Sequence, residues 1–305
     1  MQSERKNWLD IARGIAICLV ILGHSSLASG VIYKIIFSFH MPLFFFISGY
    51  VFRQKRILIW VENRSKRLFV PLFFWSIVIT GLFVWIGSET IGDSIYVWKE
   101  YVYSRWFIYA LFEVELVLQG IFKAIPKDST RFICVTLVGI IGHILCAKGI
   151  PGVLYWSTAL AQVPMMYFGI CAREYIRNKN DGKRNYFVYF VVAGVINIAA
   201  GLTNESVNVR TMEYGNVFLY YIAAISGIIV VVSISKIVQN NLILEFIGRN
   251  TLTLYLINEE IPVILHLLVS NWIVKPASIV LMILILKSKN LIENIARRRD
   301  NCNGA

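Results

Sequence analysis

The succession of long apolar runs is the feature that most constrains this fold. A helix needs roughly 17–25 mostly apolar residues to cross the bilayer hydrocarbon, and the 305-residue chain offers about ten such runs. They are residues 11–29, 31–52, 68–87, 106–125, 132–147, 153–171, 186–203, 217–238, 250–270 and 273–286. Only 16% of the residues are charged, against about 25% in soluble proteins. The sequence therefore predicts an all-α, polytopic integral membrane protein with about ten transmembrane helices: one domain over 1–290 and a basic cytoplasmic tail over 291–305.

The charge distribution predicts the orientation in the membrane. The net charge of +12 would suggest nucleic-acid binding in a soluble chain. With the N-terminus inside, however, 24 of the 30 Lys and Arg residues fall on the cytoplasmic side, as the positive-inside rule requires. We therefore expect both termini in the cytoplasm, contact with membrane lipids and no nucleic-acid partner. The alternative, a signal peptide cleaved after Ala28, is disfavoured by Asp10, Arg13 and His24 within its apolar stretch.

Cysteine and histidine patterns give no sign of a metal site. The five cysteines are scattered without a CxxC pair, and no two of the four histidines are spaced i, i+4. We expect no disulfide framework and no bound metal.

Three ionisable residues share one stripe of the first apolar run. At 100° per residue, Arg13 and His24 differ by about 20° after three turns, and Asp10 and His24 by about 40°. A rise of 1.5 Å per residue separates Arg13 from His24 by about 16 Å along the axis. Titratable side chains within a membrane segment are costly, so each is a candidate functional residue.

This stripe suits a ligand with an anionic head and a reactive end deeper in the bilayer, and acyl-coenzyme A is such a ligand. Arg13 would pair with a phosphate near Asp10, and His24 would exchange a proton near neutral pH. Two structural alternatives stay open: Arg13 as a positive-inside anchor and His24 as an interhelical hydrogen-bonding group.

Two further spans carry candidate catalytic residues. His40 lies about nine residues into the second run, at a depth comparable to His24, and next to Pro42, which can bend the helix. In the fourth run, Glu113 and Glu115 are 200° apart around the helix, so the two side chains cannot face the same cavity. One would pair with a cation and the other would help to position an acceptor hydroxyl; the sequence does not say which.

Two sequence blocks resemble the membrane acyltransferase-3 family, especially its short, fucose 4-O-acetylase-like branch. The first is LDIARGIAI at 9–17 with GH at 23–24, which meets the family's Arg-x10-His pattern at Arg13 and His24. The second is FHMPLFFFISGY at 39–50, followed by a basic segment ending at Arg64 and Arg67. Weaker similarities follow in family order at 106–107, 167–169 and 247–256.

The resemblance implies a ten-helix enzyme that moves an acyl group, usually acetyl, from cytoplasmic coenzyme A to a carbohydrate hydroxyl on the outer side of a bacterial cytoplasmic membrane. By position, Arg13 and His24 inherit donor-contact and catalytic roles, and Arg64 and Arg67 inherit coenzyme contacts. Many relatives carry His where this chain has Asn258, which puts a proton-transfer role there in doubt.

The resulting hypothesis is O-acylation of a cell-surface polysaccharide or its lipid-linked precursor, with acetyl-CoA as the donor. Its candidate catalytic residues are His24, His40 and Glu113. A proton-coupled transporter or lipid-linked sugar flippase is the alternative, in which buried acids and His24 would relay protons or bind substrate. A membrane scaffold is a third reading, disfavoured by the polar residues of the first helix.

Overall fold

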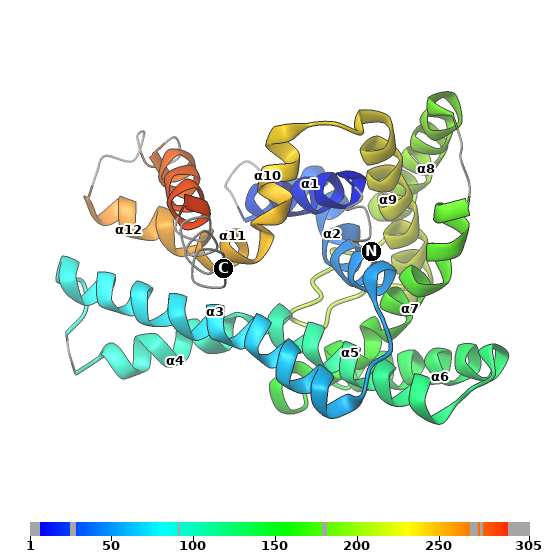
Figure 1. The fold of residues 1–305 in the computed structure, drawn as a ribbon, viewed down its shortest axis with the longest axis horizontal. Coiled ribbons are helices and arrows are strands. Elements are labelled where there is room, and N and C mark those ends of the chain that lie inside the picture. The colour runs from blue at the N-terminus through cyan, green and yellow to red at the C-terminus, as the bar shows by residue number, and fades with distance from the viewer. Residues whose placement is uncertain are drawn as a thin grey trace, which may run out of the picture. The chain divides into compact units, whose positions relative to one another are not determined.

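The computed structural model describes residues 7–24, 29–90, 92–178, 182–268, 274 and 277–291. Almost all of this part of the chain is helical (Figure 1), and its only strand-like pairing is a single bridge between Asn208 and Glu213. The labelled helices are α1 (Asn7–Gly23), α2 (Gly30–Val51), α3 (Ile57–Ile86), α4 (Ser94–Ser104), α5 (Trp106–Ala124), α6 (Asp128–Ala147), η1 (Val153–Tyr155), α7 (Trp156–Asn178), α8 (Lys183–Thr203), α9 (Val217–Val238), α10 (Leu242–Arg249), α11 (Thr251–Ile257) and α12 (Glu260–Leu268). The expectation of an all-α fold is confirmed.

The chain divides into two compact units. The first comprises Met1–Val70 and Ser104–Arg249, and the second comprises Pro71–Tyr103 and Asn250–Ala305. The first unit therefore holds α1, α2, the start of α3 and α5 to α10. All the residues that the sequence predicted as site residues belong to this first unit.

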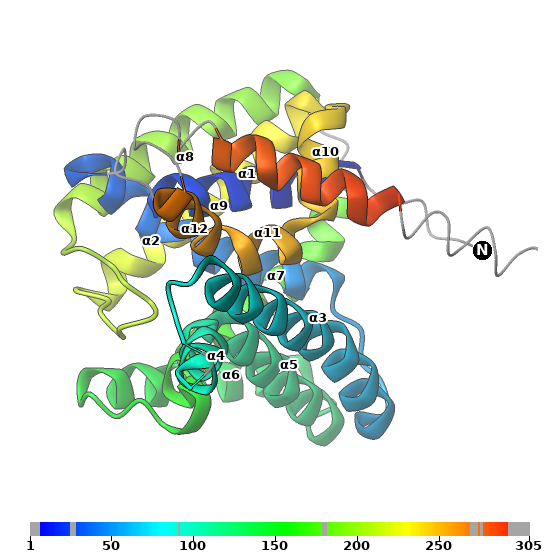
Figure 2. The ribbon, with the colours of Figure 1, turned by 90° about the vertical axis from the view of Figure 1, so that its left-hand side faces the viewer.

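Helix α2 lies at the centre of the first unit. It packs against α1, α7, α8 and α9, and the views in Figures 1 and 2 agree on this arrangement. Residues 36–47 of α2 are buried without interruption, because partner helices cover every face of this stretch. A helix that is apolar all round is expected to be buried in this way.

Glycines bring α2 and α7 into direct backbone contact. A Cβ atom added at Gly49 would lie 1.8 Å from the carbonyl oxygen of Met166, and one added at Gly169 would lie 2.0 Å from that of Phe46. Membrane helices associate through such small residues because lipid supplies no hydrophobic drive between them. Any larger side chain at either position would force the two helices apart.

Arg173 of α7 holds the C-terminal end of α2. Its guanidinium donates hydrogen bonds to the carbonyl oxygens of Gly49, Tyr50 and Phe52. The last carbonyls of a helix lack partners within the helix, and a cation there also interacts favourably with the helix dipole. Arg173 therefore fixes where α2 ends.

The second unit has its own polar and aromatic contacts. Trp98 of α4 donates from Nε1 to Ser76 Oγ of α3 at 2.8 Å and stacks on Phe73. The hydroxyl of Tyr101 donates to the carbonyl oxygen of Leu256 at 2.7 Å. These contacts join α4 to the second half of α3 and to α11.

Five of the described helices are long and apolar enough to cross a membrane. They are Gly30–Val51, Ile57–Ile86, Asp128–Ala147, Lys183–Thr203 and Val217–Val238. The pair Thr251–Ile257 and Glu260–Leu268, bent by 47°, would be a sixth span if it crosses as one. These helices make the chain a multi-pass membrane protein. By length and apolar composition, however, the described helices give five or six spans and not the expected number of about ten.

The shortfall has identifiable causes. Helix α1 has only 17 residues, α5 carries the three charged residues Glu113, Glu115 and Lys123, and the many polar residues of α7 make that helix less apolar. The predicted ninth span is broken at Asn258 and Glu259. Of the tenth, 273–286, residues 274 and 277–286 are described, and they are helical.

Several predicted connections are helical instead. Helix α3 starts at Ile57, inside the basic connection expected at 53–67, and α4 occupies much of the loop expected at 88–105. Helix α10 lies in the connection expected between the runs at 217–238 and 250–270. The predicted cleavage site at Ala28 and all but the first residue of the predicted tail, 291–305, lie outside the described residues.

Candidate active site

Arg13 and His24 lie on one continuous helix, as the sequence predicts. The α-helical hydrogen bonding of α1 extends to His24, whose backbone N–H donates to the carbonyl oxygen of Val20 at 3.0 Å. Because the helical backbone continues to His24, the helical repeat predicts that the two side chains share a face and lie about 16 Å apart along the axis. The imidazole of His24 is exposed at the end of the helix.

His24 and His40 both contact one phenylalanine, Phe37. The ring centroid of Phe37 is 6.1 Å from that of His24 and 4.7 Å from that of His40. Both histidines therefore contact Phe37 and belong to one neighbourhood.

The hydrogen bonding of His40 determines its tautomer. His40 is buried, and its Nδ1 lies 2.8 Å from the carbonyl oxygen of Ile36. A carbonyl oxygen only accepts, so Nδ1 carries the hydrogen, and Nε2 of the neutral ring holds the lone pair. The ring is thus oriented by the backbone of its own helix, with Nε2 as the atom able to accept a proton.

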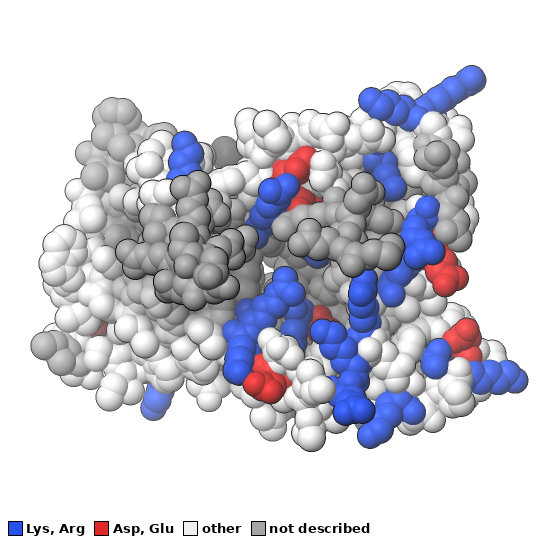
Figure 3. All heavy atoms as spheres, viewed as in Figure 1, with Lys and Arg blue, Asp and Glu red and all other residues white. Residues whose placement is uncertain are grey.

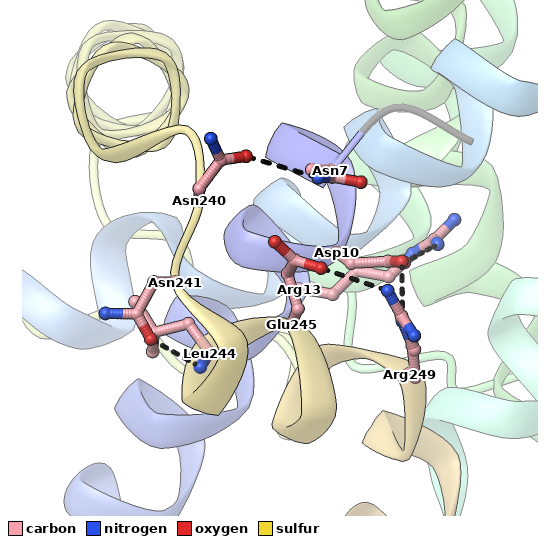
Figure 4. Close-up of polar contacts among 8 residues, drawn as sticks. All are labelled: Asn7, Asp10, Arg13, Asn240, Asn241, Leu244, Glu245 and Arg249. Atoms are coloured by element: carbon pink, nitrogen blue, oxygen red, sulfur yellow. Dashed lines mark hydrogen bonds and ion pairs between the residues drawn. The ribbon is translucent and has the colours of Figure 1, made fainter. Parts of the chain in front are cut away.

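Asp10 joins two arginines from different helices (Figure 4). Arg13 Nη1 lies 3.2 Å from Asp10 Oδ1, and Nε of Arg249, at the end of α10, lies 3.3 Å from Asp10 Oδ2. Arg249 Nη2 also contacts Glu245 Oε2 at 3.0 Å, one turn earlier on α10. Because Asp10 is almost fully buried, it would act on a ligand through the arginines that it holds.

Two glycines allow α10 to approach α1 closely enough for this cluster to form. A Cβ atom added at Gly248 would lie 1.7 Å from the carbonyl oxygen of Asp10, and one added at Gly14 would lie 2.3 Å from that of Leu244. The two helix backbones are therefore in direct contact, and Arg249 follows immediately after Gly248.

Asparagines fix the start of α10. Asn241 Oδ1 accepts a hydrogen bond from the backbone N–H of Leu244 at 2.9 Å, which is the usual role of a helix N-cap. The side chain of Asn7 donates to Asn240 Oδ1 at 3.3 Å. Figure 4 shows these contacts on the side of α10 away from Arg249, so the short helix is held to α1 at both ends.

The two glutamates of α5 have different surroundings. Glu115 forms an ion pair with Arg64 of α3, so it is the acid that pairs with a cation. Glu113 is buried, and its Oε2 has no hydrogen-bond partner among the described residues. Because Glu115 already neutralises the Arg64 guanidinium, Arg64 would attract a coenzyme phosphate less strongly than the sequence suggested.

Arg67 lies on an exposed basic segment. Lys and Arg side chains gather where α2 leads into α3, in the lower part of the face drawn in Figure 3. The exposed cations of this segment are Arg53, Lys55, Arg56, Lys66 and Arg67. A phosphate-bearing ligand would be attracted to this surface.

A pocket of about 400 Å³ lies between α2, α7, α8 and α9, and its walls are mainly apolar and aromatic. None of the predicted site residues lines it. Within the described ranges, no group of three or more His, Cys, Asp or Glu residues is arranged to hold a metal ion.

Arg249 and Glu245 are the site residues that sequence reasoning missed. Their segment was interpreted as a connection, although its sequence carried two signals of a helix. The acid and the base are spaced i, i+4, and Asn241 precedes the apolar residues as a cap would. The proximity of this helix to α1, however, depends on tertiary packing that no local pattern reveals.

Comparison with known families identifies the class of protein. Residues 6–286 match the acyltransferase-3 family model, which is described as an acyltransferase domain. The match covers most of the chain, and the chain belongs to this family. The resemblance drawn from the Arg13 and His24 block is confirmed: the chain is a multi-pass membrane member of the acyltransferase-3 family.

Two curated relatives are similar over part of the chain. Nodulation protein NolL of Mesorhizobium japonicum is 30% identical over 150 residues, 43% of this chain and 39% of the relative. NolL of Sinorhizobium fredii is 30% identical over 156 residues, 45% of this chain and 42% of the relative. The chain thus spans about two-fifths of the length of these relatives. No solved structure matches the chain.

Proposed function

We propose that the protein transfers an acyl group, typically acetyl, from acetyl-CoA on the cytoplasmic side to a sugar hydroxyl of a cell-surface polysaccharide or its lipid-linked precursor. The observation that carries this proposal is the helical backbone that continues from Arg13 in α1 to His24. Its repeat predicts that the two side chains share one face about 16 Å apart. A donor with phosphates at one end and a thioester at the other matches a cation and a base at this separation.

In this mechanism His24 acts as the general base. It takes the proton of the acceptor hydroxyl while the hydroxyl oxygen attacks the thioester carbonyl carbon. The carbon–sulfur bond breaks, the acyl group stays on the sugar oxygen, and the imidazolium returns the proton to the departing sulfur. The same ring could instead carry the acyl group transiently, with His24 as the nucleophile.

His40 and Glu113 have supporting roles in this proposal. The lone pair on Nε2 of His40, fixed by the hydrogen bond to Ile36, provides a second proton acceptor near His24. Glu113, buried and with Oε2 unpaired among the described residues, would receive a hydrogen bond from the acceptor sugar. Arg13 and Arg67 would bind the phosphates of the coenzyme, and Arg64, which already pairs with Glu115, would add a weaker contact.

The proposed location is the bacterial cytoplasmic membrane with both termini inside. The positive-inside distribution supports this orientation, and it puts Arg13 at the side where acyl-CoA is available. His24, farther along α1, would then lie toward the acceptor side.

The test compares membranes containing wild-type protein with membranes containing His24→Ala. We expect loss of O-acetyl groups on the polysaccharide, measured by proton NMR, and loss of acetyl-CoA hydrolysis or transfer by the purified protein. His266→Ala, which removes an exposed imidazole from α12, serves as the matched control. Wild-type rates of O-acetylation in His24→Ala would refute the assignment.

The alternative function, proton-coupled transport or lipid-linked sugar flipping, is favoured by one observation: the buried Glu113 with its unpaired oxygen. An acid of this kind within a membrane protein is typical of a proton relay. Purified wild-type protein that consumes no acetyl-CoA in the presence of an acceptor, yet moves protons or saccharide in vesicles, would support this alternative.

A further inference from the structure

In the cluster around Asp10, the acidic side chains are buried and the arginine side chains are accessible to solvent. The side chains of Asp10 and Glu245 are 2% and 6% exposed, whereas those of Arg13 and Arg249 are 29% and 47% exposed. The carboxylates therefore lie beneath the guanidinium groups. A molecule that approaches from solvent would meet positive charge first.

Arg249 retains hydrogen-bonding capacity on its accessible side. Its Nε faces Asp10 and its Nη2 faces Glu245, and within the described residues Nη1 makes no hydrogen bond. A guanidinium carries five N–H donors in a fixed plane, and that geometry matches the oxygens of phosphate. Since two acids already hold the group in place, little conformational freedom would be lost when it binds an anion.

The two arginines are adjacent because they share one carboxylate. Arg13 contacts Oδ1 and Arg249 contacts Oδ2 of Asp10, so the two guanidinium groups flank the same side chain. Two like charges held side by side repel each other, and an anion bound between them relieves that repulsion. The arrangement favours an anion with several oxygens over a single carboxylate.

We propose that Arg249, held beside Arg13 by the positioning residues Asp10 and Glu245, binds a phosphate of the acyl-CoA donor. This inference rests on the proposed function, because it takes acyl-CoA as the donor. It adds a binding residue at the end of α10, in the weaker block at 247–256 and not in the two blocks that suggested the site. The phosphate of an anionic lipid headgroup has the same chemistry, so the experiment must separate the two sources.

The experiment measures binding to the purified full chain in neutral detergent, with coenzyme A and with pantetheine, which lacks the nucleotide and its phosphates. Loss of a charge-assisted hydrogen bond is expected to weaken binding by about ten- to one-hundred-fold. Arg249→Gln should therefore weaken coenzyme A binding by at least about tenfold and leave pantetheine binding unchanged. Arg249→Lys should give an intermediate loss, because it keeps the charge but not the planar donor group.

A double variant guards against misfolding. Arg249→Gln alone leaves Glu245 buried without its cation, whereas Arg249→Gln combined with Glu245→Gln removes one charge of each sign. We expect the double variant to unfold near the wild-type temperature and still to bind coenzyme A at least about tenfold more weakly. The control pair Arg131→Gln with Asp128→Asn removes a comparable ion pair from α6 and should leave coenzyme A affinity unchanged.

The outcomes separate this inference from the proposed function. Wild-type protein that fails to bind coenzyme A would overturn both. If the wild type binds coenzyme A and the double variant binds it equally well, only the role of Arg249 is overturned. A defect that appears solely for micelles containing phosphatidylglycerol would assign the two arginines to a lipid headgroup and likewise overturn the inference.

Discussion

Replacing Gly248 with alanine tests the contact between α10 and α1. The added Cβ would lie 1.7 Å from the carbonyl oxygen of Asp10 and 2.9 Å from the backbone nitrogen of Gly14. Both are backbone atoms of α1, so neither can rotate away. The strain has to be relieved by moving one helix.

The size of the movement follows from ordinary contact distances. Since normal Cβ contacts begin at 3.4 Å, relief requires the two backbones to separate by about 1.7 Å at this point. The bond from Arg249 Nε to Asp10 Oδ2 is already 3.3 Å long, and a shift of this size would break it. Overpacking of this kind costs about 1–3 kcal/mol.

Two measurements on purified Gly248→Ala check the expectation. The apparent midpoint of thermal unfolding in detergent should fall, and coenzyme A affinity should fall toward that of Arg249→Gln. Gly120→Ala is the matched control, because a Cβ atom added at Gly120 of α5 meets nothing within 4 Å. That control should be neutral or more stable by up to about 1 kcal/mol, the difference in helix propensity.

A Gly248→Ala protein that unfolds at or above the wild-type temperature, as Gly120→Ala is expected to do, would refute the reasoning. Such a result would mean that α10 does not approach α1 as closely as the contact requires. The stability measurement stands independently of the proposed activity, since it depends only on the backbone contact.

Three further predictions concern the surroundings of the site. Glu115→Gln should destabilise the protein by about 3 kcal/mol, because it leaves the Arg64 cation largely buried without its partner; thermal unfolding measures this. His40→Asn should fold normally but lose acyl transfer, because its amide nitrogen can replace Nδ1 as donor to Ile36 while nothing replaces Nε2; transfer rate and unfolding temperature are compared. Arg173→Ala should lower the free energy of unfolding by about 1–3 kcal/mol for each carbonyl left unsatisfied and away from water; the unfolding temperature, which should fall, measures this.

Each of these predictions has a control or a contradicting result. Glu62→Gln breaks an exposed ion pair with Lys66 and should cost no more than about 1 kcal/mol, so a larger loss than in Glu115→Gln would contradict the burial argument. The amide nitrogen of Gln corresponds to Nε2 and not to Nδ1, so His40→Gln loses the hydrogen bond to Ile36 and should destabilise the protein more than His40→Asn. Arg173→Lys should recover part of the stability, and a wild-type melting temperature in Arg173→Ala would contradict its capping role.

The sequence predicted best what depends on neighbours along the chain. The apolar runs at 31–52 and 217–238 correspond closely to α2 and α9, because hydrophobic length is a local property that the bilayer imposes. The shared face of Arg13 and His24 was also predictable, since helical periodicity alone determines it. Where polar residues interrupt a run, as at Asn258 and Glu259, the number of membrane crossings could not be deduced.

Contacts between distant segments could not be predicted. The sequence limited Glu113 and Glu115 to different faces, but only the packing of α3 against α5 determines that Glu115 meets Arg64. Likewise, the proximity of Arg249 to Asp10 depends on two glycines from separate helices meeting at one crossing. Residues 239 positions apart have no periodic relation from which such a contact could be inferred.

The interlocking of α2 with α7 limits how the first unit can move. With glycines at 49 and 169 facing the opposite backbone, and with Arg173 clamped on the end of α2, the two helices can neither slide nor rotate against each other without a steric clash. The two helices are therefore expected to move together as one rigid pair. Under the proposed function, any opening that admits the acceptor would have to form elsewhere than between these two helices.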